Sequence, residues 1–145
     1  MKPRPRRLAF SQQAMKKMID VAWRSYPAEA VGLLAGNRGT VRSVYALCNL
    51  ASGLAFFADP YDQYLAARKM RRAGERLIAT FHSHPEGAAR LSDADRRFVF
   101  EVAPTAVVVA LNQTGRRVRV AGFTRTEGPA EAPAEIVVRR LSSAA

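Results

Sequence analysis

The chain of 145 residues is 48% hydrophobic, which suits one globular domain with a single core and excludes an intrinsically disordered protein. No apolar run approaches the roughly 20 residues of a membrane-spanning helix, so a membrane protein is not expected. The net charge of +11 does not decide the kind of partner. The single cysteine, Cys48, excludes an internal disulfide and a zinc site built from cysteines.

The positive charge is a weak guide to the partner. The basic residues are scattered along the chain in pairs, and no helix-turn-helix or RNA-binding signature accompanies them. A nucleic acid is therefore not the expected partner, and an acidic protein is equally compatible with the charge.

The N-terminal residues 1–8 are rich in arginine and proline, and we expect them to form a flexible basic tail. A secretory signal would continue with an apolar stretch, but the largely polar residues 11–17 interrupt it. We therefore expect a cytoplasmic protein.

The first half of the chain predicts a helix followed by a hairpin. Hydrophobic residues recur at helical spacing over 11–25, with Ser11 as the helix cap. The short apolar run 28–36 predicts a buried strand, and the alternating run 41–50 predicts a second strand that pairs back across a turn.

The middle of the chain predicts a helix between two strands. Residues 54–57 indicate a third, short strand, and Asp59 with Pro60 is a good helix start. Gly74 suits the end of that helix, and a strand over 76–84 follows it.

The second half continues the alternation of helices and strands. Ser92 opens a helix that runs to about residue 102, and two strands, 105–112 and 116–124, pair across a turn. Residues 127–135 are of low complexity and expected to be mobile. The final apolar stretch predicts either a strand or a short helix.

This order of elements predicts an α/β or α+β layered fold, in which helices pack on one sheet. We expect one domain over residues 9–126. Residues 127–145 would form the low-complexity segment and a C-terminal element.

The only two histidines of the chain, His82 and His84, lie at the end of a predicted strand, just before Pro85. Alternate residues of a strand point to the same face, so the two imidazoles would be neighbours. A lone histidine is more often structural. A pair at this spacing favours two nitrogen ligands on one metal ion.

Asp95 lies in the first turn of the next predicted helix, and the intervening loop is long enough to bring it back to the histidines. Two histidines and one carboxylate form a catalytic zinc set that leaves a fourth position for water. Asp93 stays open as the alternative carboxylate. Taken alone, Ser92 and Asp95 favour a helix capping box, and a cap and a site are compatible.

The stretch from His82 to Asp95 follows the pattern H-[ST]-H-P-x6-S-x-x-D at every fixed position. It resembles the signature of JAMM metalloproteases, also called MPN-plus or Mov34/MPN/PAD-1 domains. That family also carries an upstream glutamate in a short apolar segment ending in glycine, and Glu29 fills this position. The resemblance implies a single MPN/JAB-type domain with a mixed, curved sheet flanked by helices.

The resemblance also implies a role for each residue of the pattern. His82, His84 and Asp95 would bind one Zn²⁺ ion, with water as the fourth ligand. Glu29 would take the proton of that water and pass it to the leaving amine, and Ser92 would stabilise the oxyanion. Without the resemblance, Glu29 would be interpreted as a solvent-exposed residue at a strand start.

Members of this family cleave peptide or isopeptide bonds after the C-terminal Gly-Gly of ubiquitin-like proteins. The short chain resembles the compact prokaryotic members, which process sulfur-carrier proteins or bacterial ubiquitin-like conjugation proteins. A diglycine tail can lie against an exposed strand, and residues 52–58 and the segment before His82 are candidates. The candidate substrate-binding residues are Phe56, Phe57, Phe81 and Ser83.

Three alternatives fit the sequence less well. A noncatalytic MPN scaffold is disfavoured because every ligand and the glutamate are present. An amidohydrolase barrel needs about 250 residues and further histidines, which this chain lacks. A basic binding module is supported by the charge alone.

Overall fold

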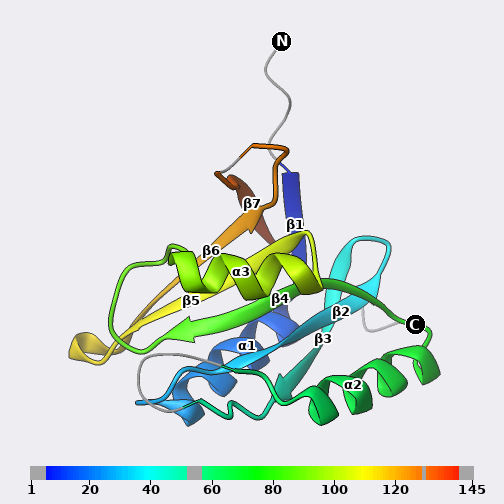
Figure 1. Cartoon of the computed structure of the whole chain (residues 1–145), viewed down its shortest axis with the longest axis horizontal. Helices are drawn as coiled ribbons and strands as arrows, with labels where there is room; N and C mark the ends of the chain where they lie inside the picture. Colours follow the sequence, from blue (N-terminus) through cyan, green and yellow to red (C-terminus); the bar gives the residue numbers. More distant parts are fainter. Residues whose placement is uncertain (1–5, 52–56, 129, 141–145) are drawn as a thin grey trace.

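Seven strands form a closed barrel in the computed structural model, which describes residues 6–51, 57–128 and 130–140. Figure 1 shows the three helices placed around this barrel. The strands are β1 (Arg6–Ser11), β2 (Val31–Asn37), β3 (Thr40–Leu47), β4 (Arg76–His84), β5 (Thr105–Asn112), β6 (Arg117–Thr124) and β7 (Ala132–Arg139). The helices are α1 (Gln12–Ser25), α2 (Pro60–Arg72) and α3 (Asp93–Val102).

The barrel is mixed, which confirms the expected mixed and curved sheet. Its strand order is β1-β3-β2-β4-β5-β6-β7, and β7 closes the ring by pairing with β1. Strand β2 runs antiparallel to both β3 and β4, whereas β4 and β5 are parallel. Because β4 and β5 are parallel, their C-terminal ends lie at the same edge of the sheet, which is the edge where β4 ends at His84.

The two faces of the sheet carry separate clusters of buried side chains. Helix α1 packs against the face that includes Phe81 of β4, and α3 lies across the other face, in front of β4 and β5 in Figure 1. His82 pairs with Val31 and Val108, which pack in the clusters that contain α2 and α3 residues. Because side chains alternate along β4, His82 faces the side covered by α2 and α3.

The helix starts were predicted correctly, because each depends on a local cap. The side chains of Ser11, Asp59 and Ser92 accept hydrogen bonds from backbone N–H groups in the first turns of α1, α2 and α3. Gly74 follows α2 with a φ of +68°, a conformation that favours glycine.

The expected basic tail is wrong for residues 6–8, which belong to β1. Strand β1 pairs in parallel with β7 along its whole length, and Leu8 and Phe10 are buried in the core beside α1. Burial of the apolar side chains at 8 and 10 stabilises the folded protein. The neighbouring arginines do not offset this free energy, because their side chains stay exposed.

The expected mobile segment is likewise wrong for residues 132–135, which form the first half of β7. The C-terminal element is thus a strand, and the barrel extends beyond both ends of the expected 9–126 domain. Residues 54–56 of the expected third strand lie outside the described residues. Next to them, Ala58 forms an isolated bridge with Asn49.

Within the described ranges, none of the helices has the length and apolar character needed to cross a membrane.

We expect Gly32→Ala to destabilise the barrel, because a Cβ at this position of β2 would press on the Phe81 ring and lie 2.5 Å from the Tyr45 carbonyl oxygen. The expected cost is about 1–3 kcal/mol of unfolding free energy, measured by chemical denaturation. Gly128→Ala is the matched control, since its nearest atom would be 3.7 Å away. Equal stability of the two variants would contradict the packing described for β2 and β4.

Candidate metal centre and active site

Three side-chain atoms meet at the end of β4 beside the first turn of α3. The Nε2 atoms of His82 and His84 are 3.2 Å apart, and the Oδ2 atom of Asp95 lies 3.1 Å from the first and 3.2 Å from the second. In a tetrahedral zinc site with bonds of about 2.0–2.1 Å, ligand atoms lie about 3.3 Å apart. The triangle therefore has the size that one zinc ion requires.

The ring of His84 is held in the orientation that a metal ligand needs. Its Nδ1 atom lies 2.8 Å from the carbonyl oxygen of Ala88, and a carbonyl only accepts hydrogen bonds. In a neutral ring the proton is therefore on Nδ1, and the lone pair of Nε2 points into the triangle. A hydrogen bond on the ring nitrogen that does not bind the metal fixes both the tautomer and the orientation of the ring.

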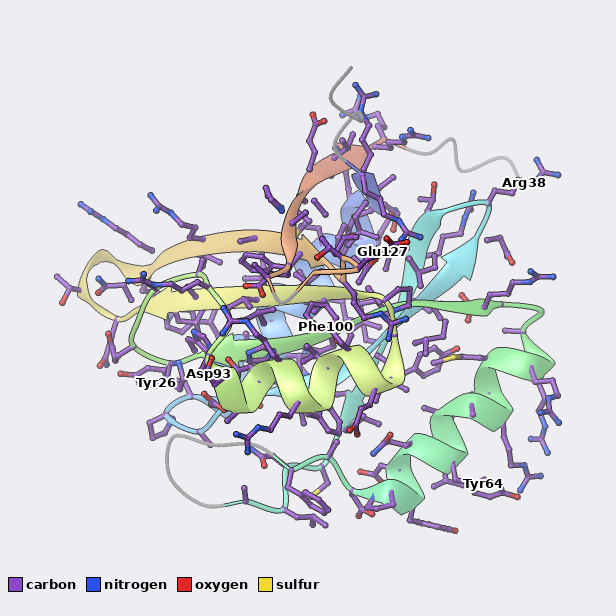
Figure 2. All side chains as sticks on the ribbon, turned by 45° about the horizontal axis from the view of Figure 1, so that its top comes forward. Tyr26, Arg38, Tyr64, Asp93, Phe100 and Glu127 are labelled. Atoms are coloured by element: carbon purple, nitrogen blue, oxygen red, sulfur yellow. The ribbon has the colours of Figure 1, made fainter. Side chains whose placement is uncertain are left out.

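Asp95 is placed by the helix start itself. Ser92 Oγ accepts a hydrogen bond from Asp95 N at 3.1 Å, and Asp95 Oδ2 accepts one from Ser92 N at 2.9 Å. The predicted capping box is confirmed, and the same carboxylate oxygen forms one corner of the triangle. Asp93 is instead exposed and pairs with Arg96 at 2.7 Å; Figure 2 shows it at the first turn of α3.

The three groups of the triangle have shifted protonation equilibria. In the metal-free protein, burial disfavours ionisation of Asp95, but hydrogen bonds donated by Nε2–H of His82 and of protonated His84 outweigh it and hold its pKa well below the usual range. Burial lowers the pKa of His82. The hydrogen bond to Asp95 raises the pKa of His84.

Glu29 lies on the same side of the sheet as the two histidines. Ala30 pairs with Ser83 through hydrogen bonds and Val31 pairs with His82, so the same register brings Glu29 level with His84. Glu29 is only 6% exposed, and its Oε2 atom has no hydrogen-bond partner among the described residues. Burial raises the pKa of Glu29 to about 7, with His84 lowering it and Asp95 raising it by smaller amounts.

Two of the expected substrate-binding residues need correction. Phe81 and Ser83 are fully buried, so their side chains cannot contact a substrate. Phe81 packs in the core beside α1, and Ser83 Oγ accepts a hydrogen bond from Ala30 N at 2.7 Å. Phe57 is 53% exposed, and Phe56 lies outside the described residues.

Sequence reasoning missed Asn49, which contacts the backbone of Glu29. Its Nδ2 atom donates to the Glu29 carbonyl oxygen at 2.9 Å. An asparagine after a strand is typical of a turn, so its type and position gave no signal of this contact.

A second group of metal-binding atom types lies elsewhere, at Cys48, Asp59 and Asp62. Its two carboxylates accept hydrogen bonds from backbone N–H groups: Asp59 from Tyr61 N, as the cap of α2, and Asp62 from Cys48 N. These bonds explain why the three residues lie together.

Comparison with known proteins gives matches of sequence and of structure. Residues 11–121 match the model of the family described as prokaryotic homologs of the JAB domain. The chain is 40% identical over 74 residues to a probable TtuB-protein conjugate cleaving protease of Thermus thermophilus. That match covers 50% of this chain and 49% of the relative, so it spans about half the length of each.

Two solved structures illustrate the similarity in fold. Protein DSY2949 from Desulfitobacterium hafniense has a TM-score of 0.77 and 28% identity, over 93% of this chain and 94% of its own. A structure described as JAMM, a metalloprotease-like zinc site in the proteasome and signalosome, has a TM-score of 0.57 and 17% identity, over 90% and 98% of the two chains.

The triangle predicts which carboxylate matters for zinc. Asp95→Ala should weaken zinc binding by more than the roughly 10–100-fold caused by losing an outer hydrogen-bond partner of a ligand. Asp93→Ala should bind zinc as the wild type does, because Asp93 faces Arg96. Competition with a chromophoric chelator measures both affinities, and the reverse order would assign the third ligand to Asp93.

The raised pKa of Glu29 predicts a pH-dependent stability of the metal-free protein. The unfolded state loses its proton near pH 4.5, whereas the folded state keeps it up to about pH 7. Stability is therefore lost as pH rises across this range, by up to about 3 kcal/mol. Glu29→Gln avoids this loss and should be more stable than the wild type at pH 8, but not at pH 4.

Urea unfolding of metal-free protein at the two pH values measures this difference. The exposed Glu127→Gln is the control and should match the wild type at both. An equal effect of Glu29→Gln at pH 4 and pH 8 would show that Glu29 is not buried as the structure has it.

Proposed function

Because the chain belongs to the family of prokaryotic homologs of the JAB domain, we propose that it is a zinc-dependent peptidase or isopeptidase. Its substrate would be a ubiquitin-like protein, either a sulfur carrier or a bacterial conjugation protein, cleaved after its C-terminal Gly-Gly. The observation that carries this proposal is a buried glutamate, Glu29, on the same side of the sheet as the triangle of His82, His84 and Asp95, with no hydrogen bond to its Oε2 atom from the described residues.

The residues of the triangle fit a zinc ion by atom type and by spacing. His82 and His84 would hold it through Nε2 and Asp95 through Oδ2, with one position left open. A zinc ion bound there supplies a Lewis acid and lowers the pKa of a water molecule to about 7.

Glu29 would act as the general base and then as the general acid. Its Oε2 atom accepts no hydrogen bond from the part of the chain that the structure describes, so it can receive a proton from the attacking water. A pKa raised by burial is the condition under which a carboxyl group both accepts and returns a proton near neutral pH. The proton would then pass to the leaving amine.

Ser92 would stabilise the carbonyl oxygen of the substrate as negative charge develops on it. Its Oγ atom accepts from Asp95 N, which leaves the hydroxyl proton available as a donor. Because the cap fixes Oγ at the start of α3, the donor is positioned before the substrate binds, as oxyanion stabilisation requires.

The nature of the substrate is supported less directly. The Thermus relative is named for cleaving TtuB-protein conjugates, which supports a conjugate between a protein modifier and its target. The Gly-Gly end and the ubiquitin-like character are inferred from the JAMM pattern. The charge of +11 would favour the approach of an acidic partner.

The decisive experiment incubates the zinc-loaded protein with a ubiquitin-like sulfur-carrier protein ending in Gly-Gly, fused to a short C-terminal extension, and follows intact mass. We expect cleavage after Gly-Gly. Glu29→Gln should keep zinc and lose about 10²–10⁴-fold in rate, and Ser92→Ala should keep zinc and lose about 10²-fold. Cleavage by Glu29→Gln at the wild-type rate would refute the proposed mechanism.

A further inference from the structure

We infer that Asn49 is a positioning residue that ties the backbone of Glu29 to the backbone of Ala51 and Phe57. The inference rests on the proposed function, since it assigns Asn49 the task of holding the general base in place. It adds a residue that the motif pattern does not contain.

The carboxamide of Asn49 joins three backbone positions. Its Nδ2 atom donates to the Glu29 carbonyl oxygen at 2.9 Å. Its Oδ1 atom accepts from the N–H groups of Ala51 at 3.0 Å and of Phe57 at 2.9 Å. One side chain therefore links the backbone of the glutamate to the backbone N–H groups of Ala51 and Phe57.

Glu29 needs such support because it lies just before the first residue of β2, Val31. The hydrogen bonds to Ser83 hold Ala30, and the Asn49 bond holds the carbonyl of Glu29 itself. Since no described residue forms a hydrogen bond with Oε2 of Glu29, the carboxylate is positioned by the packing around it and by the backbone that carries it. A misplacement of about 1 Å can cost roughly 10²-fold in rate.

Two hydrophobic residues next to these hydrogen bonds, Leu50 and Phe57, are accessible to an incoming protein. Leu50 and Phe57 are 56% and 53% exposed, and Leu50 N donates to the Phe57 carbonyl oxygen at 2.8 Å. Together with the Asn49–Ala58 bridge, these bonds keep the backbone of Phe57 beside Asn49. A substrate that packs on Leu50 and Phe57 is thereby held at a fixed distance from Glu29.

Two substitutions separate the two functions of the carboxamide. Asn49→Ala removes the hydrogen bonds to the backbone of Glu29, Ala51 and Phe57. Asn49→Asp keeps an acceptor for Ala51 and Phe57 but removes the donor to the Glu29 carbonyl. Asn37→Ala is the matched control, because the amide of Asn37 faces the carbonyl oxygens of Gly36 and Gly74 at the far end of β2.

We expect Asn49→Ala to lower kcat by about 10–100-fold, with zinc affinity unchanged and with faster amide hydrogen exchange at Ala51 and Phe57. Asn49→Asp should restore slow exchange at these two amides but not kcat. Asn37→Ala should leave kcat and both amides at their wild-type values, even where it lowers the melting temperature equally.

Wild-type kcat in either Asn49 variant would overturn the inference, as would an equal loss of kcat in Asn37→Ala. Fast exchange of Ala51 and Phe57 in the wild type would overturn it without touching the proposed function. A zinc-loaded wild type that cleaves no fusion overturns the proposed function, and the catalytic part of the inference with it.

Discussion

The site depends on a pair of hydrogen bonds between Ala30 and Ser83. Ala30 N donates to Ser83 Oγ, and Ser83 N donates to the Ala30 carbonyl oxygen. They extend the pairing of β2 and β4 one step beyond Val31 and His82, and this brings Glu29 level with His84. A slip of one residue would turn Glu29 to the opposite face of the sheet. The serine between the two histidines thus extends the β2–β4 ladder to the residue beside Glu29, which brings the glutamate to ligands distant in the sequence.

This register brings two carboxylates and two imidazoles together in a largely buried site. Burying carboxylates in this way costs free energy unless a positive charge compensates them. The environment shifts the pKa values of the two carboxyl groups in opposite directions. Hydrogen bonds from the histidines keep Asp95 ionised, and burial raises the pKa of Glu29 to about 7. Such a separation is how a site assigns different tasks to chemically similar groups. Asp95 is suited to hold a cation and Glu29 to carry a proton.

Local signals in the sequence predicted most of the fold, because caps and alternation act over a few residues. The helix starts at Ser11, Asp59 and Ser92 and the strand ending at His84 were predicted correctly. Strand β1 was hidden by the arginines around Leu8, and β7 by its prolines and glutamates; both exist because they pair with each other, a long-range contact. The burial of Glu29 required the family resemblance, and the contact of Asn49 with its backbone required the structure.

The most direct test of this account is a crystal structure of the zinc-loaded protein with anomalous data collected at the zinc edge. We expect one peak about 2.0–2.1 Å from His82 Nε2, His84 Nε2 and Asp95 Oδ2, on the side of the sheet where Glu29 lies. A peak at Cys48, Asp59 and Asp62 instead, or no peak in the triangle of the histidines and Asp95, would contradict it.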